Sequence, residues 1–482
     1  MAAAGIRLAE ASDEVRAVVG ALIGRARDAQ RRYAGFDQRG VDDVAAAAAW
    51  AIMEPARNRE LAELAVRDTG LGDVADKIQK NHRKTLGLMR DLKGTRTVGV
   101  IGEDHDRGIV EIARPVGVVA AITPSTNPAA TPANKIVNAL KCGNAVIVAP
   151  SPKGQGTAQR LVDLMHAEMV RSGLAPELAT GLVQVLPAPV TKAATHELMR
   201  QADLIVATGS QANVRAAYSS GTPAFGVGAG NVAAIVDASA DPVAAASRIA
   251  RSKTFDNATS CSSENALVVV DSIFDQTMAA LAAEGGVMLD GPDTERLASA
   301  MWPDGKLASA LIAQTAPRIA QIAGLADARA RHARFLMVAE DSWGAAHPFS
   351  GEKLSPVLAV YRARGLDDAA RIVEGIYGYQ GAGHSVGLHT ATPSDAVSLG
   401  LRLPVSRVIV NQAHCIATGG SFDNGLPFSL SMGCGTWGGN SFSENMHYRH
   451  YLNVTRVAYP IAPREPGVDD IFGDYFQRHG RR

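Results

Sequence analysis

VGVVAAI, the segment from residue 116 to residue 122, is an uninterrupted, almost wholly apolar run that ends at a polar loop. Such a run is typical of a strand that is buried on both faces of a parallel sheet. Working outward, we expect further strands at 145–148, 181–186, 204–208 and 232–236, with helices between them at 132–140, 156–172, 193–201 and 212–219. Strands that alternate with helices predict an α/β fold with a doubly wound parallel sheet.

The same alternation resumes after a boundary that we expect near residues 238–243. Here the expected strands are 266–270, 357–361, 385–389 and 408–410, and the expected helices are 241–253, 274–284, 294–300, 367–376 and 393–400. The sequence therefore predicts a first α/β domain at 1–240, a second at 241–430, and a return to the first domain at 431–482.

The flanking segments have other patterns. Helical spacing begins after Ser12 and continues in the segments 41–52 and 57–66. Two extended segments, 95–101 and 108–112, are separated by a charged turn and predict a hairpin. A last extended segment spans 452–459 and precedes a tail with the apolar residues Ile471, Phe472, Tyr475 and Phe476.

Composition excludes several classes of protein. The 482 residues carry 48 basic and 48 acidic side chains, a balance that argues against nucleic acid or an anionic membrane as partner. Four cysteines are too few for a disulfide framework, and Glu10, Asp13 and Glu14 interrupt any early apolar run that a signal peptide would need. The longest uncharged stretch, 115–134, contains four prolines and cannot be a membrane helix. We therefore expect a cytoplasmic protein.

Cys261 is the strongest candidate nucleophile. It is surrounded by serines in the segment TSCSSEN, directly before an apolar strand. A thiol on such a loop can be partly exposed and still rigidly held, as a nucleophile requires. A small core cysteine is the alternative interpretation. Cys434, in GCGTWGG, is the rival nucleophile, whereas Cys142 fits a packing role.

Polar residues follow two of the predicted strands. Asn127, in STNP, could donate an amide N–H to a developing oxyanion, or could form an Asx turn before the proline. The segment Thr208, Gly209 and Ser210 ends a strand and opens a helix, a geometry that points backbone N–H groups at a phosphate. It is a weak dinucleotide signature, because Val214 stands at the third glycine position.

The histidines give less information. His384, in GAGHS, is a candidate acid–base or orienting group, although an isolated histidine is more often structural. His447 and His450 lack cysteine or carboxylate partners at metal-ligand spacing, so we predict that they are surface residues and that there is no metal site.

Together these motifs resemble the aldehyde dehydrogenase superfamily, and more narrowly its coenzyme A-acylating members. The motifs are PVGVVAAITPSTNPAATP, ATGS, FGVGAGN, FDNATSCSSEN, EKLSPVL, GAGHS and SMGCGTWGGNSFSEN, in that order. The resemblance spans the chain to about residue 459. It implies a Rossmann-type NAD(P)-binding domain, a catalytic α/β domain, and a small β oligomerisation element made of 95–113 and 452–459. It also implies a homodimer or homotetramer.

The resemblance assigns catalytic roles. Cys261 would attack an aldehyde, Asn127 and the Cys261 backbone N–H would hold the oxyanion, and hydride would leave to the nicotinamide. We include His384 among the catalytic residues. Gly226 stands where hydrolytic members carry the glutamate that activates water, a base worth about 10²–10⁴-fold. Coenzyme A is therefore the expected acceptor. A hydrolytic enzyme that has lost its base, and a non-catalytic nucleotide-binding protein, are the alternatives.

The resemblance also indicates the cofactor site. The expected contacts are Thr123, Pro124, Ser151, Lys153, Thr208, Gly209, Ser210, Gly228 and Glu352, of which Glu352 matches the position that holds the nicotinamide ribose. Pro152 replaces the glutamate that NAD-preferring members carry after their second strand, and Lys153 adds a cation beside it. NADP is therefore expected over NAD, although Lys153 could equally be a solvated surface charge.

The substrate pocket is expected to include the polar loop after strand 408–410, with Asn411, His414, Cys415 and Thr418. This loop suits a small polar or anionic aldehyde. With CSSEN at the nucleophile, the pattern is similar to that of the acylating dehydrogenases of sulfoacetaldehyde. Sulfoacetaldehyde and sulfoacetyl-CoA are thus the expected pair. Acetaldehyde, succinate semialdehyde and other short aldehydes are alternatives.

Overall fold

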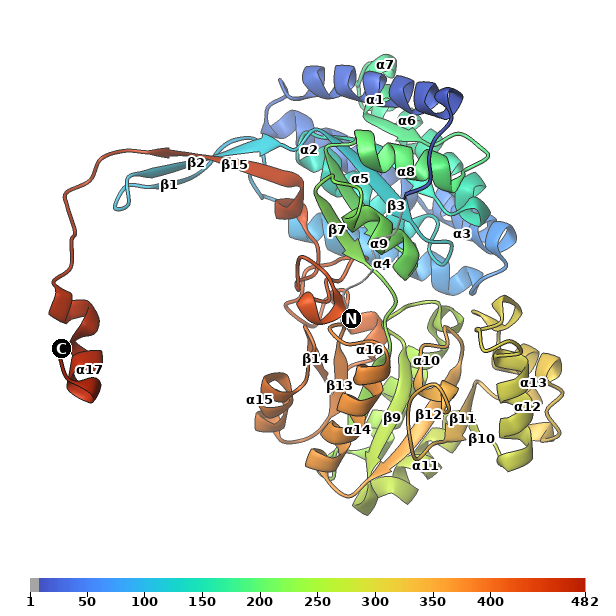
Figure 1. The fold of residues 1–482 in the computed structure, drawn as a ribbon. Coiled ribbons are helices and arrows are strands. Elements are labelled where there is room, and N and C mark those ends of the chain that lie inside the picture. Colours follow the sequence, from blue (N-terminus) through green and yellow to red (C-terminus); the bar gives the residue numbers. More distant parts are fainter. Residues whose placement is uncertain (1–7, 482) are drawn as a thin grey trace.

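Residues 8–481 are described in the computed structural model, so the parts of the predictions that fall on residues 1–7 and 482 lie outside it. Three sheets organise these residues (Figure 1). Two are parallel sheets, one in each half of the body, and the third is an antiparallel arm. Helices pack on both parallel sheets, which confirms the predicted α/β fold.

The first parallel sheet has the strand order β5-β4-β3-β6-β7. Its strands are β3 (Val118–Thr123), β4 (Ala145–Pro150), β5 (Val183–Val185), β6 (Leu204–Thr208) and β7 (Ala224–Val227). Every residue of β3 and β4 is buried, which is why both are continuous apolar runs. Strand β7 was not predicted, because its glycine-rich segment lacks that composition.

The second parallel sheet has the order β10-β11-β12-β9-β8-β13-β14. Its strands are β8 (Val232–Val236), β9 (Glu264–Val270), β10 (Gly286–Met288), β11 (Phe335–Ala339), β12 (Val357–Ala363), β13 (Val386–His389) and β14 (Val408–Val410). The segment 232–236 is expected in the first domain, but it forms β8, which pairs with β9 and β13 of the second sheet. The change of sheet therefore falls between β7 and β8, before the predicted 238–243. An apolar strand does not reveal which sheet it joins.

The helices before the second sheet mostly match the predicted pattern. They are α1 (Asp13–Tyr33), α2 (Gln38–Met53), α3 (Pro55–Thr69), α4 (Val74–Leu92), α5 (Ala130–Lys141), α6 (Gln155–Arg171), α7 (Pro176–Leu182), α8 (Lys192–Gln201) and α9 (Gln211–Tyr218). The Ser12 side chain caps α1 by accepting the N–H of Val15. Helix α4 was missed, because lysines occupy much of its buried face.

The remaining helices are α10 (Pro242–Thr254), α11 (Phe274–Ala283), α12 (Gly291–Met301), α13 (Ala316–Ala323), α14 (Leu366–Tyr379), α15 (Pro393–Arg402), α16 (His414–Ala417) and α17 (Val468–His479). After the second sheet the chain returns toward the first domain, where Cys434, Phe442, Met446 and Tyr451 join its hydrophobic core. Among residues 8–481, none of the helices has the length and apolar character needed to cross a bilayer.

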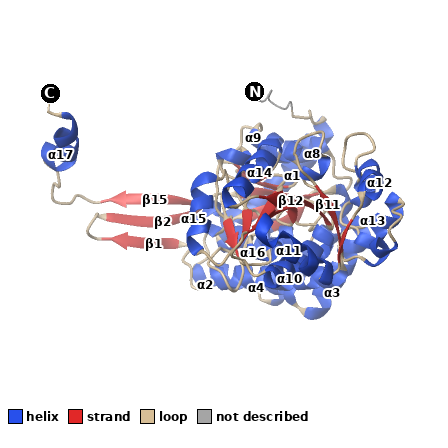
Figure 2. Ribbon diagram, turned by 90° about the horizontal axis from the view of Figure 1, so that it is seen from below, coloured by secondary structure: helices blue, strands red, loops and turns tan. Residues whose placement is uncertain are grey.

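The antiparallel arm consists of β1 (Gly99–Asp104), β2 (Ile109–Pro115) and β15 (Leu452–Ala458), in the order β1-β2-β15. It joins the predicted hairpin to the predicted last strand. The arm projects from the body, and α17 lies beyond its tip, well apart from both domains (Figure 2). The four large apolar side chains of α17 that are most exposed are Val468, Ile471, Phe472 and Tyr475.

Candidate active site

Cys261 and His384 form the centre of the candidate site. The Cys261 Sγ lies 3.5 Å from His384 Nε2. Cys261 precedes β9, whereas His384 precedes β13, so two strands of the second sheet bring the pair together. Cys261 is partly exposed, whereas Cys142, Cys415 and Cys434 are buried. The thiol predicted to be the nucleophile is thus the accessible one of the four.

The surroundings of this pair disfavour the charged form of both groups. Burial raises the pKa of the Cys261 thiol to about 12, and the nearby Glu352 carboxylate adds to the rise. Burial, assisted by Arg407, holds the pKa of His384 well below its usual value. His384 Nδ1 lies 2.7 Å from the Ser385 hydroxyl. When Nδ1–H donates to Ser385, Nε2 is left as an acceptor for the thiol proton.

Asn127 is held by a lysine of α4. The Lys80 ammonium donates a 2.8 Å hydrogen bond to Asn127 Oδ1, and it also pairs with the buried carboxylate of Asp256. Asp256 lies in the turn before Cys261, at a φ of 52°. The amide oxygen of Asn127 is therefore occupied, and its NH₂ group is the end available to a ligand.

The glycine-rich loop after β7 packs directly on the Cys261–His384 pair. A Cβ at Gly230 would lie 2.5 Å from the Cys261 carbonyl oxygen and 3.0 Å from His384 Cδ2. The N–H of Gly230 donates to Glu352 Oε1 at 3.2 Å. Burial raises the pKa of Glu352 to about 8. Any side chain at position 230 would displace the catalytic pair, which accounts for the glycine.

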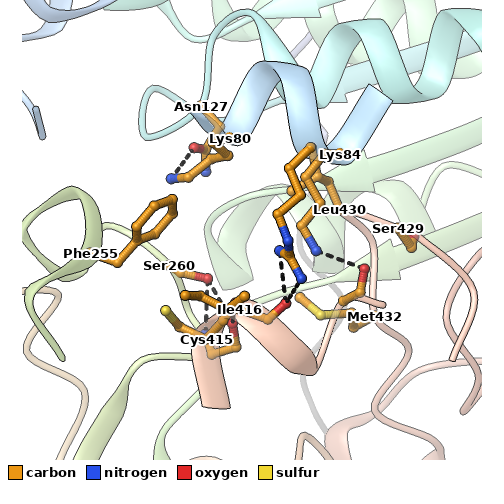
Figure 3. A pocket seen from close by; sticks show the side chains of 13 residues that line it. Lys80, Lys84, Asn127, Phe255, Ser260, Cys415, Ile416, Ser429, Leu430 and Met432 are labelled. Carbon is orange, nitrogen blue, oxygen red and sulfur yellow. Dashed lines mark hydrogen bonds between the residues drawn. The ribbon is translucent and has the colours of Figure 1, made fainter. Parts of the chain in front are cut away.

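A cavity of about 30 Å³ opens beside the nucleophile loop, where Figure 3 shows Ser260 in its wall. Lys80 and Lys84 come down from α4 on one side, and Ser260, Cys415 and Ile416 lie opposite. The remaining lining residues are Arg83, Asn127, Phe255, Ser262, Gly419, Ser429, Leu430 and Met432. Ser260 and Ser262 flank Cys261 in the chain, so the cavity lies next to the nucleophile loop.

A second cleft, of about 250 Å³, lies next to the segment that leads to His384. The loop after β7 supplies Gly228 and Ala229, and the segment before His384 supplies Gly381 and Ala382. Residues close in sequence to Cys261 line the first cavity, and residues close in sequence to His384 line the second cleft.

The predicted cofactor residues gather at the carboxyl edge of the first sheet. Thr123 and Pro124 end β3, Ser151 and Lys153 follow β4, Thr208 to Ser210 follow β6, and Gly228 follows β7. The Thr123 hydroxyl is buried with no hydrogen-bond partner in the described structure, as expected of a group that a ligand would meet. Ligands of open parallel sheets bind at this edge. The residues present thus fit a dinucleotide.

Comparison with known proteins agrees with this arrangement. The family model described as "Aldehyde dehydrogenase family" matches residues 2–296. The chain belongs to the aldehyde dehydrogenase family. It is 65% identical over 463 residues to a sulfoacetaldehyde dehydrogenase (acylating) from Cupriavidus necator, covering 96% of this chain and 93% of that relative. It is 43% identical to a protein of the same description from Bilophila wadsworthia, over 95% of this chain and 98% of that one.

A solved structure extends the likeness to the whole fold of this aldehyde dehydrogenase. It is an acetylating aldehyde dehydrogenase from Geobacillus thermoglucosidasius, with a TM-score of 0.89 and 34% identity, covering 94% of this chain and 99% of that one. The chain is therefore an oxidoreductase of the acylating branch, which confirms the predicted family.

Of the loop expected to line the substrate pocket of this dehydrogenase, Cys415 lines the first cavity, whereas Asn411, His414 and Thr418 are not among its lining residues. Asn411 bonds to the backbone of Thr390, and the Thr418 hydroxyl donates to the His414 carbonyl. His414 Nδ1 lies 2.8 Å from the Ser262 carbonyl oxygen, so this histidine supports the nucleophile loop from behind. His414 and Thr418 are buried, at the start of the short helix α16 and directly after it.

The structure adds an observation at Gly226 and revises the expectations for Cys434 and for His447 and His450. A Cβ at Gly226 would lie 2.8 Å from Val214 Cγ1 and 3.1 Å from the Tyr218 ring, so a glutamate there would meet α9. Cys434 is 4% exposed, and burial raises its pKa to about 11, which makes it a poor rival nucleophile. His447 and His450 are half-buried rather than at the surface.

Two groups of functional side chains escaped sequence reasoning. The cations of α4 recur at positions 77, 80 and 84, a spacing of one helical face that could have revealed the helix. Arg407 is buried and donates to the carbonyls of His384 and Gly433. It positions the histidine backbone, but no local motif surrounds it.

Proposed function

We propose that this enzyme interconverts sulfoacetaldehyde and sulfoacetyl-CoA, with aldehyde oxidation coupled to reduction of NAD(P). The observation that carries the proposal is the partly exposed residue Cys261, whose Sγ lies 3.5 Å from His384 Nε2. The identity to acylating sulfoacetaldehyde dehydrogenases supports this substrate and product.

The chain's own residues supply acid–base and electrostatic catalysis. Cys261 Sγ bonds to the aldehyde carbon while its proton passes to His384 Nε2. The NH₂ of Asn127 and the backbone N–H of Cys261 donate to the resulting oxyanion. A bound nicotinamide would supply the hydride acceptor that turns the adduct on Cys261 into a thioester. Attack by the coenzyme A thiol on that thioester releases acyl-CoA and returns the thiol of Cys261, which takes the coenzyme A proton. His384 releases to solvent the proton it took from Cys261.

Coenzyme A is the proposed acceptor rather than water. A thiol ionises far more readily than water and needs less help from a base. Gly226 offers no carboxylate, and the Glu352 carboxyl accepts the Gly230 N–H with its pKa raised to about 8. The second cleft, which borders the segment before His384 and shares no lining residue with the aldehyde cavity, is the proposed place of coenzyme A.

NADP is the proposed cofactor. Pro152 places no carboxylate after β4, and the exposed Lys153 offers a cation for a 2′-phosphate. Thr123, Thr208, Gly209, Ser210 and Gly228 would lie along the dinucleotide, with Glu352 at the nicotinamide ribose. Replacing Lys153 with alanine should raise the KM for NADP while leaving the KM for NAD unchanged.

The arm and α17 are proposed to join two copies of the chain. Strand β15 is the outer strand of the arm, and most of its residues are exposed. An unpaired strand edge and an apolar helix held away from the body are both features that a second subunit would cover.

The direct test measures formation of reduced nicotinamide with a panel of short aldehydes, with and without coenzyme A. We expect strict dependence on coenzyme A, with sulfoacetaldehyde giving the highest kcat/KM. Equal turnover without coenzyme A would mean that water is the acceptor and would overturn the acyl-transfer step. A higher kcat/KM for acetaldehyde would overturn the substrate assignment alone.

A further inference from the structure

Two cations in the aldehyde cavity contact no carboxylate of the described residues, although the charge of Asp423 acts on Arg83 from farther away. The Lys84 ammonium donates to the backbone carbonyls of Gly419 and Gly420, at 2.7 and 3.5 Å. The Arg83 guanidinium donates to the Ile416 and Gly420 carbonyls and to the Ser421 hydroxyl. Within residues 8–481, neither cation forms an ion pair with a carboxylate. Lys77 and Lys80, on the same helix, both pair with Asp256.

The burial of Lys84 makes this unusual. Lys84 is 7% exposed, and an uncompensated charge in such a place is costly. Burial lowers its pKa to about 7, and the neighbouring cations Arg83 and Lys80 lower it further. Cys415 is the other titratable group that faces it. The Lys84 ammonium has carbonyl acceptors and the Phe428 ring as neighbours, and neither neutralises its charge.

The cavity wall combines polar, apolar and cationic side chains, which suits a short molecule with a carbonyl group at one end and a charged group at the other. One end holds Asn127 and the serines that flank Cys261, where an aldehyde carbonyl would react. Phe255, Ile416, Leu430 and Met432 supply an apolar section of the wall. Lys84 (Figure 3) and Arg83 also line the cavity and give it positive charge, so an anionic group on the substrate would neutralise that charge.

We propose that Lys84 and Arg83 form the subsite that binds the anionic tail of the substrate, a sulfonate, and so select sulfoacetaldehyde over uncharged aldehydes. This inference rests on the proposed function and names the residues that determine its specificity. A sulfonate oxygen replaces the missing counter-ion of Lys84, and the guanidinium of Arg83 provides a second charge. The subsite lies on α4 rather than on the loop 411–418 where the sequence had suggested it.

The kinetic test compares sulfoacetaldehyde with propionaldehyde in the full-length enzyme. Lys84→Met and Arg83→Met should each lower the ratio of the two kcat/KM values about 10- to 100-fold, the range for loss of one hydrogen bond to a charged group. Lys84→Arg should recover part of the ratio. Lys93→Met, which removes an exposed cation at the end of the same helix, is the matched control. A ratio unchanged in both cavity variants would overturn the proposal.

A binding test does not depend on turnover. In the wild-type enzyme, 2-hydroxyethanesulfonate should slow alkylation of Cys261 by iodoacetamide, as followed by mass spectrometry, whereas 1-propanol should not. The protection should be lost in Lys84→Met and Arg83→Met and kept in Lys93→Met. Protection without sulfoacetaldehyde turnover would support the anion subsite and refute the proposed substrate. No protection of the wild-type enzyme would refute the subsite, even if sulfoacetaldehyde were oxidised.

Discussion

Lys80 Nζ lies 2.8 Å from Asn127 Oδ1, and the same ammonium pairs with Asp256. Asp256 lies in the turn that precedes Cys261. One lysine thus connects the proposed oxyanion donor to the turn that carries Cys261. Because Oδ1 is occupied, the amide can offer only its NH₂ to a ligand. Lys80 is therefore a positioning residue, acting through Asn127.

Lys80→Met should lower kcat by about tenfold or more, but by less than Asn127→Ala, since loss of an oxyanion donor costs about 10²–10³-fold. The double variant should be no slower than Asn127→Ala alone, because both changes remove the same function. Lys77→Met is the control: it also removes a partner of Asp256 but does not touch Asn127. If the two losses multiplied in the double variant, Lys80 would not act through Asn127.

The neutral state of the Cys261–His384 pair predicts a simple pH dependence. With its pKa raised to about 12, the free thiol should be alkylated faster as pH rises, by about tenfold per unit from pH 7 upward. Because the pKa of His384 is well below its usual value, the profile should show no step near pH 6.5. A step there would show that His384 titrates.

His384→Ala should lower kcat by about 10²–10⁴-fold, the usual contribution of a general base. Ser385→Ala, which removes only the partner of Nδ1, should have a smaller effect. Both rates are measured in the presence of saturating coenzyme A and cofactor. An equal loss of kcat in the two variants would mean that His384 acts only in the tautomer that Ser385 holds in place.

The buried ammonium of Lys84 makes stability depend on pH. Its pKa is about 7 in the folded protein and about 10.4 in an unfolded chain. Between these values the unfolded state holds the extra proton, so the free energy of unfolding rises with pH, by up to about 1.4 kcal/mol per unit. Urea unfolding at about pH 7 and about pH 9.5 should show this rise for the wild type relative to Lys84→Met. A difference in the free energy of unfolding between the wild type and Lys84→Met that stays the same at both pH values would contradict the lowered pKa.

The sheets were largely predictable because their strands are buried on both faces. VGVVAAI and the run from Ala145 to Val148 contain no polar residue that could be mistaken for a loop, and both form strands. The sheet to which a strand belongs is a tertiary property, so the segment 232–236 was placed in the wrong domain. Strand β7 was missed because Gly226 has no side chain to mark a strand.

The candidate site was predictable where a reactive side chain has informative neighbours in the sequence. The serines around Cys261 and the small residues around His384 are local signals, and the structure brings the two side chains together. Lys84 gave no such signal, because its place is decided by carbonyl groups more than 300 residues away. A periodicity of apolar residues cannot detect a helix whose buried face carries lysines.

The exposed apolar face of α17 leads to the last prediction, on assembly. Ile471 and Phe472 are 61% and 50% exposed on a helix held beyond the tip of the arm (Figure 1). A chain that ends at Tyr459 should dissociate at concentrations where the full chain sediments as a dimer or larger. Ile471→Glu with Phe472→Glu should do the same, because burying each side chain is worth about 1.5–3 kcal/mol. Asp474→Ala, on the same helix, is the control. Sedimentation equal to that of the full chain in both variants would show that α17 does not hold the subunits together.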